Sequence, residues 1–289
     1  MMQHQIDPTV DCVFKAIFGK EENKNLLLHF LNAVLESEEG FHIQEVSLLN
    51  PFNEREYTED KLSVVDLKAR DTEGRHYQIE IQLALHPGLK ARILYTWSTL
   101  YHALINKGDD FTILRPVLSI WLLTEKLFAE IQDYHLAFHV YEPKHKVRLS
   151  EHLGIHLLQL PDWETRAASQ SELDRWMYFF KEGKELDIEA PPPILQTREM
   201  KQAMSVLREF SENQTDYLLY QSRYLAELTY NTRQRFINQV MDRTERVRKE
   251  AEQAKKEAEL AKAEKELFRQ KYEHVLALLE QAGIDPQQV

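Results

Sequence analysis

The chain has 289 residues, of which 43% are hydrophobic and 29% are charged, and its formal net charge is −11. This length suits one large domain or two ordinary ones, and the hydrophobic fraction is sufficient for a buried core. The negative charge argues against a protein coated with basic residues for nucleic-acid binding, although it leaves room for a locally basic or metal-filled cleft.

Membrane association and secretion are not expected. No run approaches the ~20 apolar residues of a membrane span, and the first residues lack the basic and apolar regions of a secretory signal. Cys12 is the single cysteine, which excludes an internal disulfide. It lies among apolar neighbours, as a buried small hydrophobic residue does. We therefore predict a cytoplasmic protein.

The N-terminal part predicts a pair of helices followed by a strand. Apolar residues at helical spacing run from about Asp11 to Ser37, and Gly40 ends the pattern. A strand is predicted at about Phe41–Leu49. Asp11 and Lys15 are one helical turn apart and share a face.

Residues 61–82 form two alternating segments around a glycine-containing turn, which predicts a β-hairpin. A three-residue connection with left-handed Gly74 would pair Asp71 with Arg75 and set Asp66 directly across from Glu80. Opposed carboxylates have β-carbons ~5 Å apart and repel each other. A divalent metal ion with oxygen ligands is the natural cation to place between them.

A different turn would remove that site. A two-residue turn at Glu73 and Gly74 pairs Asp66 with Ile81 instead, because a shift of one residue moves every side chain to the other face. The hairpin would then be an ordinary one with solvated acidic residues.

The middle of the chain predicts a helix and three further strands. The break at residues 86–88 precedes a helix from about Leu89 to Lys107. Arg92 lies on one stripe of this helix, whereas Leu94 and Trp97 belong to its apolar side. The strands are predicted at Val117–Thr124, Tyr134–Tyr141 and Ile155–Leu160, and a helical pattern runs from Trp163 to Lys181.

Two histidine pairs, His135 with His139 and His152 with His156, have a spacing that zinc sites use on helices. The first pair lies on a predicted strand, where residues four apart are ~13 Å from each other. Such a pair cannot share one ion unless the segment is helical.

The C-terminal part is predicted to be helical throughout. Residues 189–193, Glu-Ala-Pro-Pro-Pro, are the best boundary candidate. From residue 237 a 4-3 repeat of mostly apolar residues continues for six heptads, which predicts a coiled coil over residues 237–282 and self-association. Alanines fill the middle of the seam and Lys265 occupies a core position, which disfavours tight higher oligomers. The alternative is a long solvated helix.

Several of these segments together resemble one protein family. Asp66 followed by Glu80-Ile81-Gln82 resembles the PD-(D/E)XK nuclease signature, with Gln82 in the place of the usual lysine. The chain is similar in further motifs to the Rpn recombination-promoting nucleases, also called PD-(D/E)XK family transposases. These motifs are residues 7–19, 30–35, 49–52, Lys61 with 65–66, and 92–101. Together they are specific, whereas each alone is weak.

The resemblance implies an α/β fold with a mixed sheet flanked by helices. It also implies that Asp66, Glu80 and the Ile81 carbonyl bind Mg²⁺, or another divalent cation such as Mn²⁺ or Ca²⁺. Gln82 can only hydrogen-bond, so the positive charge of the usual lysine must come from elsewhere.

Three basic residues are candidates for that charge and for contacting DNA. Lys61 begins the strand of Asp66, Lys68 shares its face, and Arg92 opens the next helix. Arg92 would clamp phosphate bidentately or, alternatively, pair with a nearby carboxylate. The resemblance places Asp11 and Lys15 near the cleft as accessory residues, with a plain ion pair within the helix as the alternative.

We therefore predict a metal-dependent DNA endonuclease of the recombination-promoting type. Its nuclease-like domain would span residues 1–190, a helical region 191–236 and a coiled-coil tail 237–282. The alternative is a non-catalytic scaffold or adaptor with a nuclease fold, in which Gln82 and the acidic surface mark lost chemistry and the coil recruits a partner.

Overall fold

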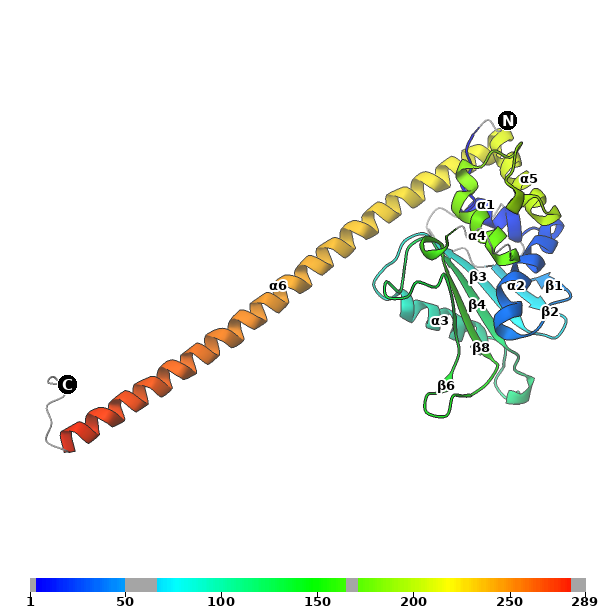
Figure 1. Cartoon of the computed structure of the whole chain (residues 1–289). Coiled ribbons are helices and arrows are strands. Elements are labelled where there is room, and N and C mark those ends of the chain that lie inside the picture. The colour runs from blue at the N-terminus through cyan, green and yellow to red at the C-terminus, as the bar shows by residue number, and fades with distance from the viewer. Residues whose placement is uncertain (1–3, 50–66, 165–170, 282–289) are drawn as a thin grey trace. The chain divides into compact units, whose positions relative to one another are not determined.

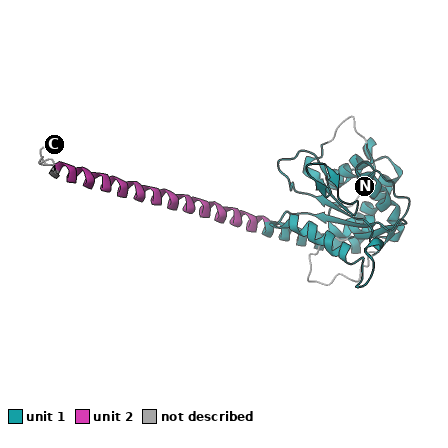
Figure 2. Ribbon diagram, turned by 90° about the horizontal axis from the view of Figure 1, so that it is seen from below, with its two compact units in different colours: residues 1–234 teal, residues 235–289 magenta. Residues whose placement is uncertain are grey.

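The computed structural model describes residues 4–49, 67–164 and 171–281. It divides into two compact units, residues 1–234 and 235–289 (Figure 2). The helices are α1 (Asp11–Phe18), α2 (Lys24–Glu39), α3 (Leu89–His102), α4 (Glu172–Glu182), α5 (Arg198–Glu212) and α6 (Gln214–Gln281). The strands are β1 (Val46–Leu48), β2 (Leu67–Asp71), β3 (His76–Gln82), β4 (Val117–Leu123), β5 (His135–Phe138), β6 (Tyr141–Glu142), β7 (Val147–Arg148) and β8 (Leu153–Gln159).

A mixed sheet forms the centre of the first unit (Figure 1). Its strand order is β1-β2-β3-β4-β8-β5 among the described residues. The first three strands are antiparallel, β3, β4 and β8 are parallel, and β5 returns antiparallel to β8. A parallel pair needs a crossover connection, and α3 lies in the one that joins β3 to β4. The predicted α/β fold, a mixed sheet flanked by helices, is confirmed.

Helices cover both faces of the sheet. Tyr77, Ile79 and Ile81 of β3 face a large apolar core shared with α1, α2, α4 and α5. The opposite face packs on α3 through a smaller core around Trp121 of β4. The central strands are therefore buried on both faces, as is usual for strands in parallel arrangement. Cys12 is buried in the larger core, as predicted.

The predicted β2–β3 hairpin is confirmed in its turn and in its register. Gly74 has φ +85°, in the left-handed region. The Asp71 amide donates to the Arg75 carbonyl at 3.1 Å. The ladder then pairs Leu67 with Ile79 and Lys68 with Gln78. The two-residue turn, which would have shifted this register by one residue, does not occur.

A buried carboxylate holds the turn. Asp71 accepts hydrogen bonds from the backbone amides of Glu73 and Arg75, both at 2.9 Å. Its second oxygen accepts from Arg75 Nε at 2.6 Å and from the Tyr77 hydroxyl at 2.7 Å. Burial and the neighbouring Asp71 carboxylate raise the pKa of Tyr77, which keeps its hydroxyl a donor.

The predicted apolar face of α3 and the predicted start of α4 differ from the structure. Leu94, predicted on the apolar side of α3, is 56% exposed, because Leu89, Ile93 and Trp97 form the face that packs on the sheet. The helical pattern from Trp163 also begins too early. Helix α4 starts at Glu172, where the Ser171 side chain accepts from the amide three residues later in a capping box.

The predicted division at the proline run stays a prediction. In the structure α5 packs on α1 and α2, so residues 198–212 share the core of the first unit. None of the described helices combines the length and the apolar composition that a bilayer-spanning helix requires.

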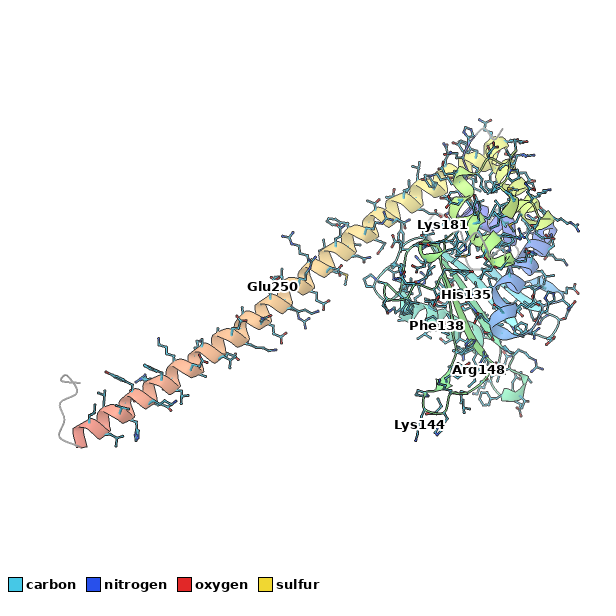
Figure 3. The ribbon with its side chains drawn as sticks, viewed as in Figure 1. His135, Phe138, Lys144, Arg148, Lys181 and Glu250 are labelled. Carbon is cyan, nitrogen blue, oxygen red and sulfur yellow. The ribbon has the colours of Figure 1, made fainter. Side chains whose placement is uncertain are left out.

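Helix α6 continues through the whole described part of the second unit. Its side chains, Glu250 among them, project from the helix (Figure 3). The apolar seam residues that are exposed there are Ile237, Val240, Val247, Phe268, Tyr272 and Val275.

The Asp71 network leads to a stability prediction. Asp71→Ala should lower the free energy of unfolding by about 3–5 kcal/mol, because it leaves the Arg75 guanidinium without its buried partner. Urea denaturation, followed by the tryptophan fluorescence of the first unit, measures this free energy of unfolding. Glu73→Ala is the matched control, since it removes the exposed carboxylate on the same arginine. Equal losses from the two variants would contradict the role given to Asp71.

Candidate active site

Alternate residues of β3 carry polar side chains on the α3 face of the sheet. Gln78, Glu80 and Gln82 share this face, because successive residues of a strand point to opposite sides. All three are buried. In the parallel pairing with β4, Glu80 lies beside Trp121. A buried strand interior is an unusual place for three polar residues, and each needs a partner.

Glu80 is the acidic centre of this group. Its side chain is 1% exposed and has the Arg92 guanidinium 3.7 Å from Oε2. Gln78 Nε2 donates a hydrogen bond to Oε1. The carboxylate is therefore held in place by an amide on the same strand and by a cation from the following helix, which offsets part of the cost of burying its charge.

Arg92 connects Glu80 with Gln82. It lies in the first turn of α3, and its Nη1 donates to Gln82 Oε1 at 3.3 Å. The guanidinium also lies 5.8 Å from the Trp121 ring centre. Its side chain is 30% exposed, so the guanidinium extends from the buried carboxylate to solvent. Gln82 uses its amide nitrogen to donate to the Ala84 carbonyl at 2.7 Å.

The structure thus brings together three of the predicted site residues, namely Glu80, Gln82 and Arg92. Lys68 is on the same face, paired across the ladder with Gln78, and is half-buried. The Ile81 backbone lies between Glu80 and Gln82, while its side chain enters the larger core. Asp66 and Lys61 lie outside the described residues.

Gln78 was missed by the sequence analysis. Gln78 lies two residues before Glu80 and four before Gln82, so the alternation of the strand places all three on one face. This alternation could have identified Gln78 as a site residue. Its Oε1 is buried and accepts no hydrogen bond from any described residue. A buried amide oxygen of this kind is a potential ligand for a cation.

Asp11 and Lys15 do not join this group. Helix α1 contributes to the core on the opposite face of the sheet. There the Asp11 amide donates to Glu227 Oε1 of α6 at 3.1 Å. Burial raises the pKa of Asp11, and burial together with the Asp11 charge raises the pKa of Glu227 to about 8. The two acids therefore belong to the contact between α1 and α6.

The comparisons with known proteins agree with this architecture. Residues 8–233 match the family described as PD-(D/E)XK nuclease family transposase. The chain belongs to this family. No curated protein and no solved structure gives a significant match. The predicted resemblance is confirmed over most of the chain, and the chain carries a nuclease-type domain.

Nucleases of the PD-(D/E)XK type typically use divalent metal ions. The residues on the α3 face fit such an ion, because the donors are the Glu80 carboxylate and the otherwise unbonded Gln78 Oε1. Oxygen donors of these two types suit Mg²⁺ better than they suit zinc.

The contact between Asp11 and Glu227 predicts a pH dependence of stability. The ordinary pKa of a glutamate is 4.5, and that of Glu227 is raised to about 8. Between these values the unfolded chain ionises more readily than the folded one, so this group destabilises the fold increasingly as the pH rises.

Glu227→Gln removes that ionisation and keeps an oxygen for the Asp11 amide. The melting temperature of the variant should exceed that of the wild type at pH 8 and match it at pH 4.5. Each kcal/mol of difference in the free energy of unfolding should shift the melting temperature by about 2–4 °C. Glu209→Gln, which changes an exposed carboxylate on α5, is the control. A difference that is constant across this pH range would contradict the assignment.

Proposed function

We propose that the protein is a metal-dependent DNA endonuclease that hydrolyses phosphodiester bonds, of the type associated with recombination and transposition. The observation that carries the proposal is the contact of Arg92 on α3 with Glu80 and Gln82, which lie on one face of β3, in a PD-(D/E)XK family chain. Continued by one residue pair, the β2–β3 register would align position 66 with Glu80.

In this proposal Asp66, Glu80 and the Ile81 carbonyl hold Mg²⁺ or a similar divalent cation. When bound, the cation lowers the pKa of a water molecule and stabilises negative charge on the phosphate. The chain's own residues position the reactants. Gln78 fixes the orientation of Glu80 through its amide. Gln82 offers its amide for a hydrogen bond to the attacking water.

Arg92 takes over the role of the cation that the family's usual lysine provides. Its guanidinium is fixed by Gln82 and Glu80 at one edge and reaches solvent at the other. A fork of N–H donors in this position suits two phosphate oxygens. Lys68 on the same face would add a contact to the DNA backbone, and Lys61, which lies outside the described residues, is proposed to add another, so the acidic net charge need not prevent binding.

The second candidate is a non-catalytic scaffold with a nuclease fold. Two contacts favour it specifically. The Glu80 carboxylate is already paired with the Arg92 guanidinium, and the Gln82 amide nitrogen donates a hydrogen bond to the Ala84 carbonyl. In a scaffold these contacts would be the final state of the site and would need no metal ion.

Cleavage of supercoiled plasmid separates the two functions, because a closed circle has no ends and only an endonuclease can nick it. We expect nicking with Mg²⁺ or Mn²⁺ and none with EDTA. Glu80→Gln and Asp66→Asn should each reduce the rate by about 100-fold or more, since the loss of a single electrostatic contact to a transition state costs about 10²–10³. Glu73→Gln on the same hairpin should leave the rate unchanged.

Gln82→Lys is a second test, because the nuclease and the scaffold predict opposite changes in the cleavage rate. If Arg92 already supplies the positive charge, a second cation at position 82 repels the metal ion, and the rate should fall or change little. An inactive wild type together with an active Gln82→Lys variant would favour the scaffold.

The second unit is proposed to join two or more copies of the chain through residues 237–282. The support is the exposed apolar seam of α6, which has no covering element within its own unit in the described residues. A coiled coil with a second copy buries this seam. Several seam positions are alanine, so we expect a dimer with modest affinity.

Sedimentation equilibrium tests this association. The wild type should show a mass above the 34.2 kDa of one chain. Phe268→Lys on the seam should reduce the mass to that of a monomer at low micromolar concentration, because a charge enters the apolar interface. Leu267→Lys is the matched control, since Leu267 is also exposed but lies off the seam. A monomeric wild type, or equal effects of both variants, would contradict the proposal.

A further inference from the structure

A second cluster of metal-ligating side chains lies on the sheet face opposite to Glu80. Glu39 is the last residue of α2, His139 follows β5, and His156 lies within β8. Glu39 Oε1 is 2.6 Å from His139 Nε2 and 3.0 Å from His156 Nε2. The three side chains are only 3%, 8% and 0% exposed, respectively. Three potential ligand atoms from three separate elements thus converge on one buried point.

The sheet pairing explains why these histidines meet although their sequence spacing argued against a shared ion. His135 and His139 are indeed too far apart along one strand. However, β5 runs antiparallel to β8 with Ala137 opposite His156. The histidines that meet are therefore one from each predicted pair, His139 and His156. Spacing within a strand does not exclude ligands from two neighbouring strands.

Gly154 leaves the space in which the Glu39 carboxylate approaches His156. A Cβ atom at this position of β8 would lie 3.0 Å from Glu39 Oε1 and 3.5 Å from His156 Nε2. The same atom would also collide with the Leu118 side chain. Any other residue would therefore fill the space beside the carboxylate and the imidazole. The absence of a side chain leaves the ligand atoms adjacent to one another.

Surrounding groups orient two of the three ligand residues, His156 and Glu39, as metal ligands require. His156 can present a lone pair at Nε2 only if its proton is on Nδ1, and Nδ1 lies 3.1 Å from His135 Nε2, which can accept that proton in a hydrogen bond. Arg148 Nη2 is 3.1 Å from Glu39 Oε2, which leaves Oε1 for an ion. Partners of this kind fix the tautomer and direction of metal ligands in many proteins.

We propose that Glu39, His139 and His156 bind a zinc ion. Two imidazole nitrogens and one carboxylate oxygen are a ligand set that zinc uses, with a water molecule in the fourth position. Imidazole suits zinc better than it suits Mg²⁺, so this site and the site at Glu80 select different metals. The zinc ion would tie the end of α2 to β5 and β8.

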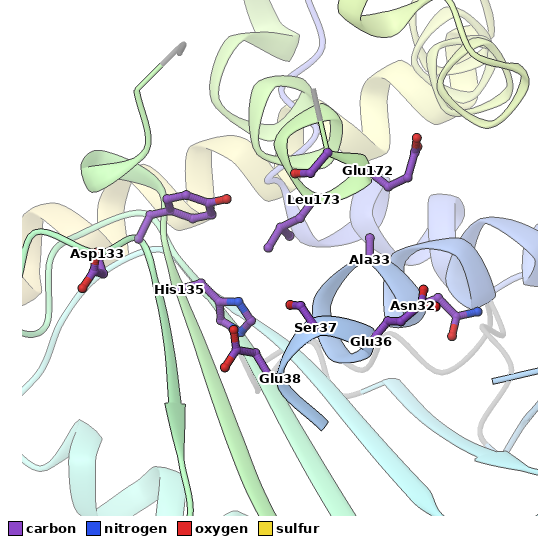
Figure 4. A pocket seen from close by; sticks show the side chains of 11 residues that line it. Asn32, Ala33, Glu36, Ser37, Glu38, Asp133, His135, Glu172 and Leu173 are labelled. Carbon is purple, nitrogen blue, oxygen red and sulfur yellow. The ribbon is translucent and has the colours of Figure 1, made fainter. Parts of the chain in front are cut away.

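A cavity gives solvent a path toward the cluster. It has a volume of about 630 Å³ and lies between the end of α2, the start of β5 and the start of α4. Figure 4 shows His135 on one wall and Ser37 and Glu38 of α2 on the other. His135 also contacts His156. His135 therefore lines the cavity and also contacts one of the three ligand residues.

Zinc binding by untagged, metal-free protein tests the proposal. We expect one equivalent of Zn²⁺ per chain by equilibrium dialysis with metal analysis, for the wild type and for Glu80→Gln alike. Glu39→Gln and His139→Gln should each weaken binding at least about 10-fold, because even partners of zinc ligands change affinity by about 10–100-fold. His145→Gln is the matched control, since His145 also contacts a carboxylate, Glu142, but is exposed.

Two measurements on the wild type keep the test valid if a variant fails to fold. Co²⁺ should give the visible absorption of a four-coordinate site, and Zn²⁺ should raise the melting temperature of both the wild type and Glu80→Gln. A wild type that binds no zinc would overturn the proposal, as would a folded His139→Gln variant with unchanged affinity. The cluster would then be a hydrogen-bonded link between α2 and the sheet. Neither outcome depends on whether the chain cleaves DNA.

Discussion

The carboxylate of Asp71 closes the β2–β3 turn with four hydrogen bonds, and the pairing of the two strands follows from that closure. The turn sets the register of the hairpin, and the register decides which residues of β2 share a face with Glu80 of β3. If the turn were one residue shorter, the pairing would shift by one residue, and the Lys68 side chain would lie on the face opposite to Glu80. The crossover that follows β3 then brings Arg92 back over the same face. A local interaction in a loop thus fixes which residues of β2 lie on the polar face of β3.

Both faces of the sheet contain a buried carboxylate, and each is compensated in a different way. Glu80 has one guanidinium that reaches solvent, whereas Glu39 has two imidazoles and the Arg148 guanidinium around it. Burial opposes ionisation of Glu39, but its contacts with His156, His139 and Arg148 outweigh burial and lower the pKa of Glu39 to about 2. Glu80 is therefore compensated by a side chain that extends to solvent, whereas Glu39 is compensated by three groups that surround it.

The hairpin could be predicted from the sequence because its determinants are local. Gly74 and the alternation of β3 lie within a dozen residues, and the turn geometry transmits directly to the register. Arg92 could be placed near a carboxylate because a crossover helix must pack back onto the strand that it follows. In contrast, the side of the sheet on which α1 packs depends on the whole domain, so Asp11 was expected near the cleft and lies on the other face.

The cluster of Glu39 with His139 and His156 could not be predicted for the same reason. Its members are separated by 100 and 117 residues, and only the pairing of β5 with β8 brings the two histidines together. The prediction of which face of α3 packs on the sheet was a smaller error of this kind. Leu94 and Ile93 are adjacent in the sequence, and the choice between them is made by the packing of Trp121 and its neighbours on the sheet.

Strand β3 divides its side chains between an apolar core and a polar cluster. Its odd-numbered residues Tyr77, Ile79 and Ile81 enter the large core, and its even-numbered residues Gln78, Glu80 and Gln82 face α3. A substitution at position 82 therefore changes a side chain that contacts Arg92 and leaves the apolar contacts of the opposite face in place. Under the proposed function, the residues of β3 that would act on a substrate are thus separate from those that hold the domain together.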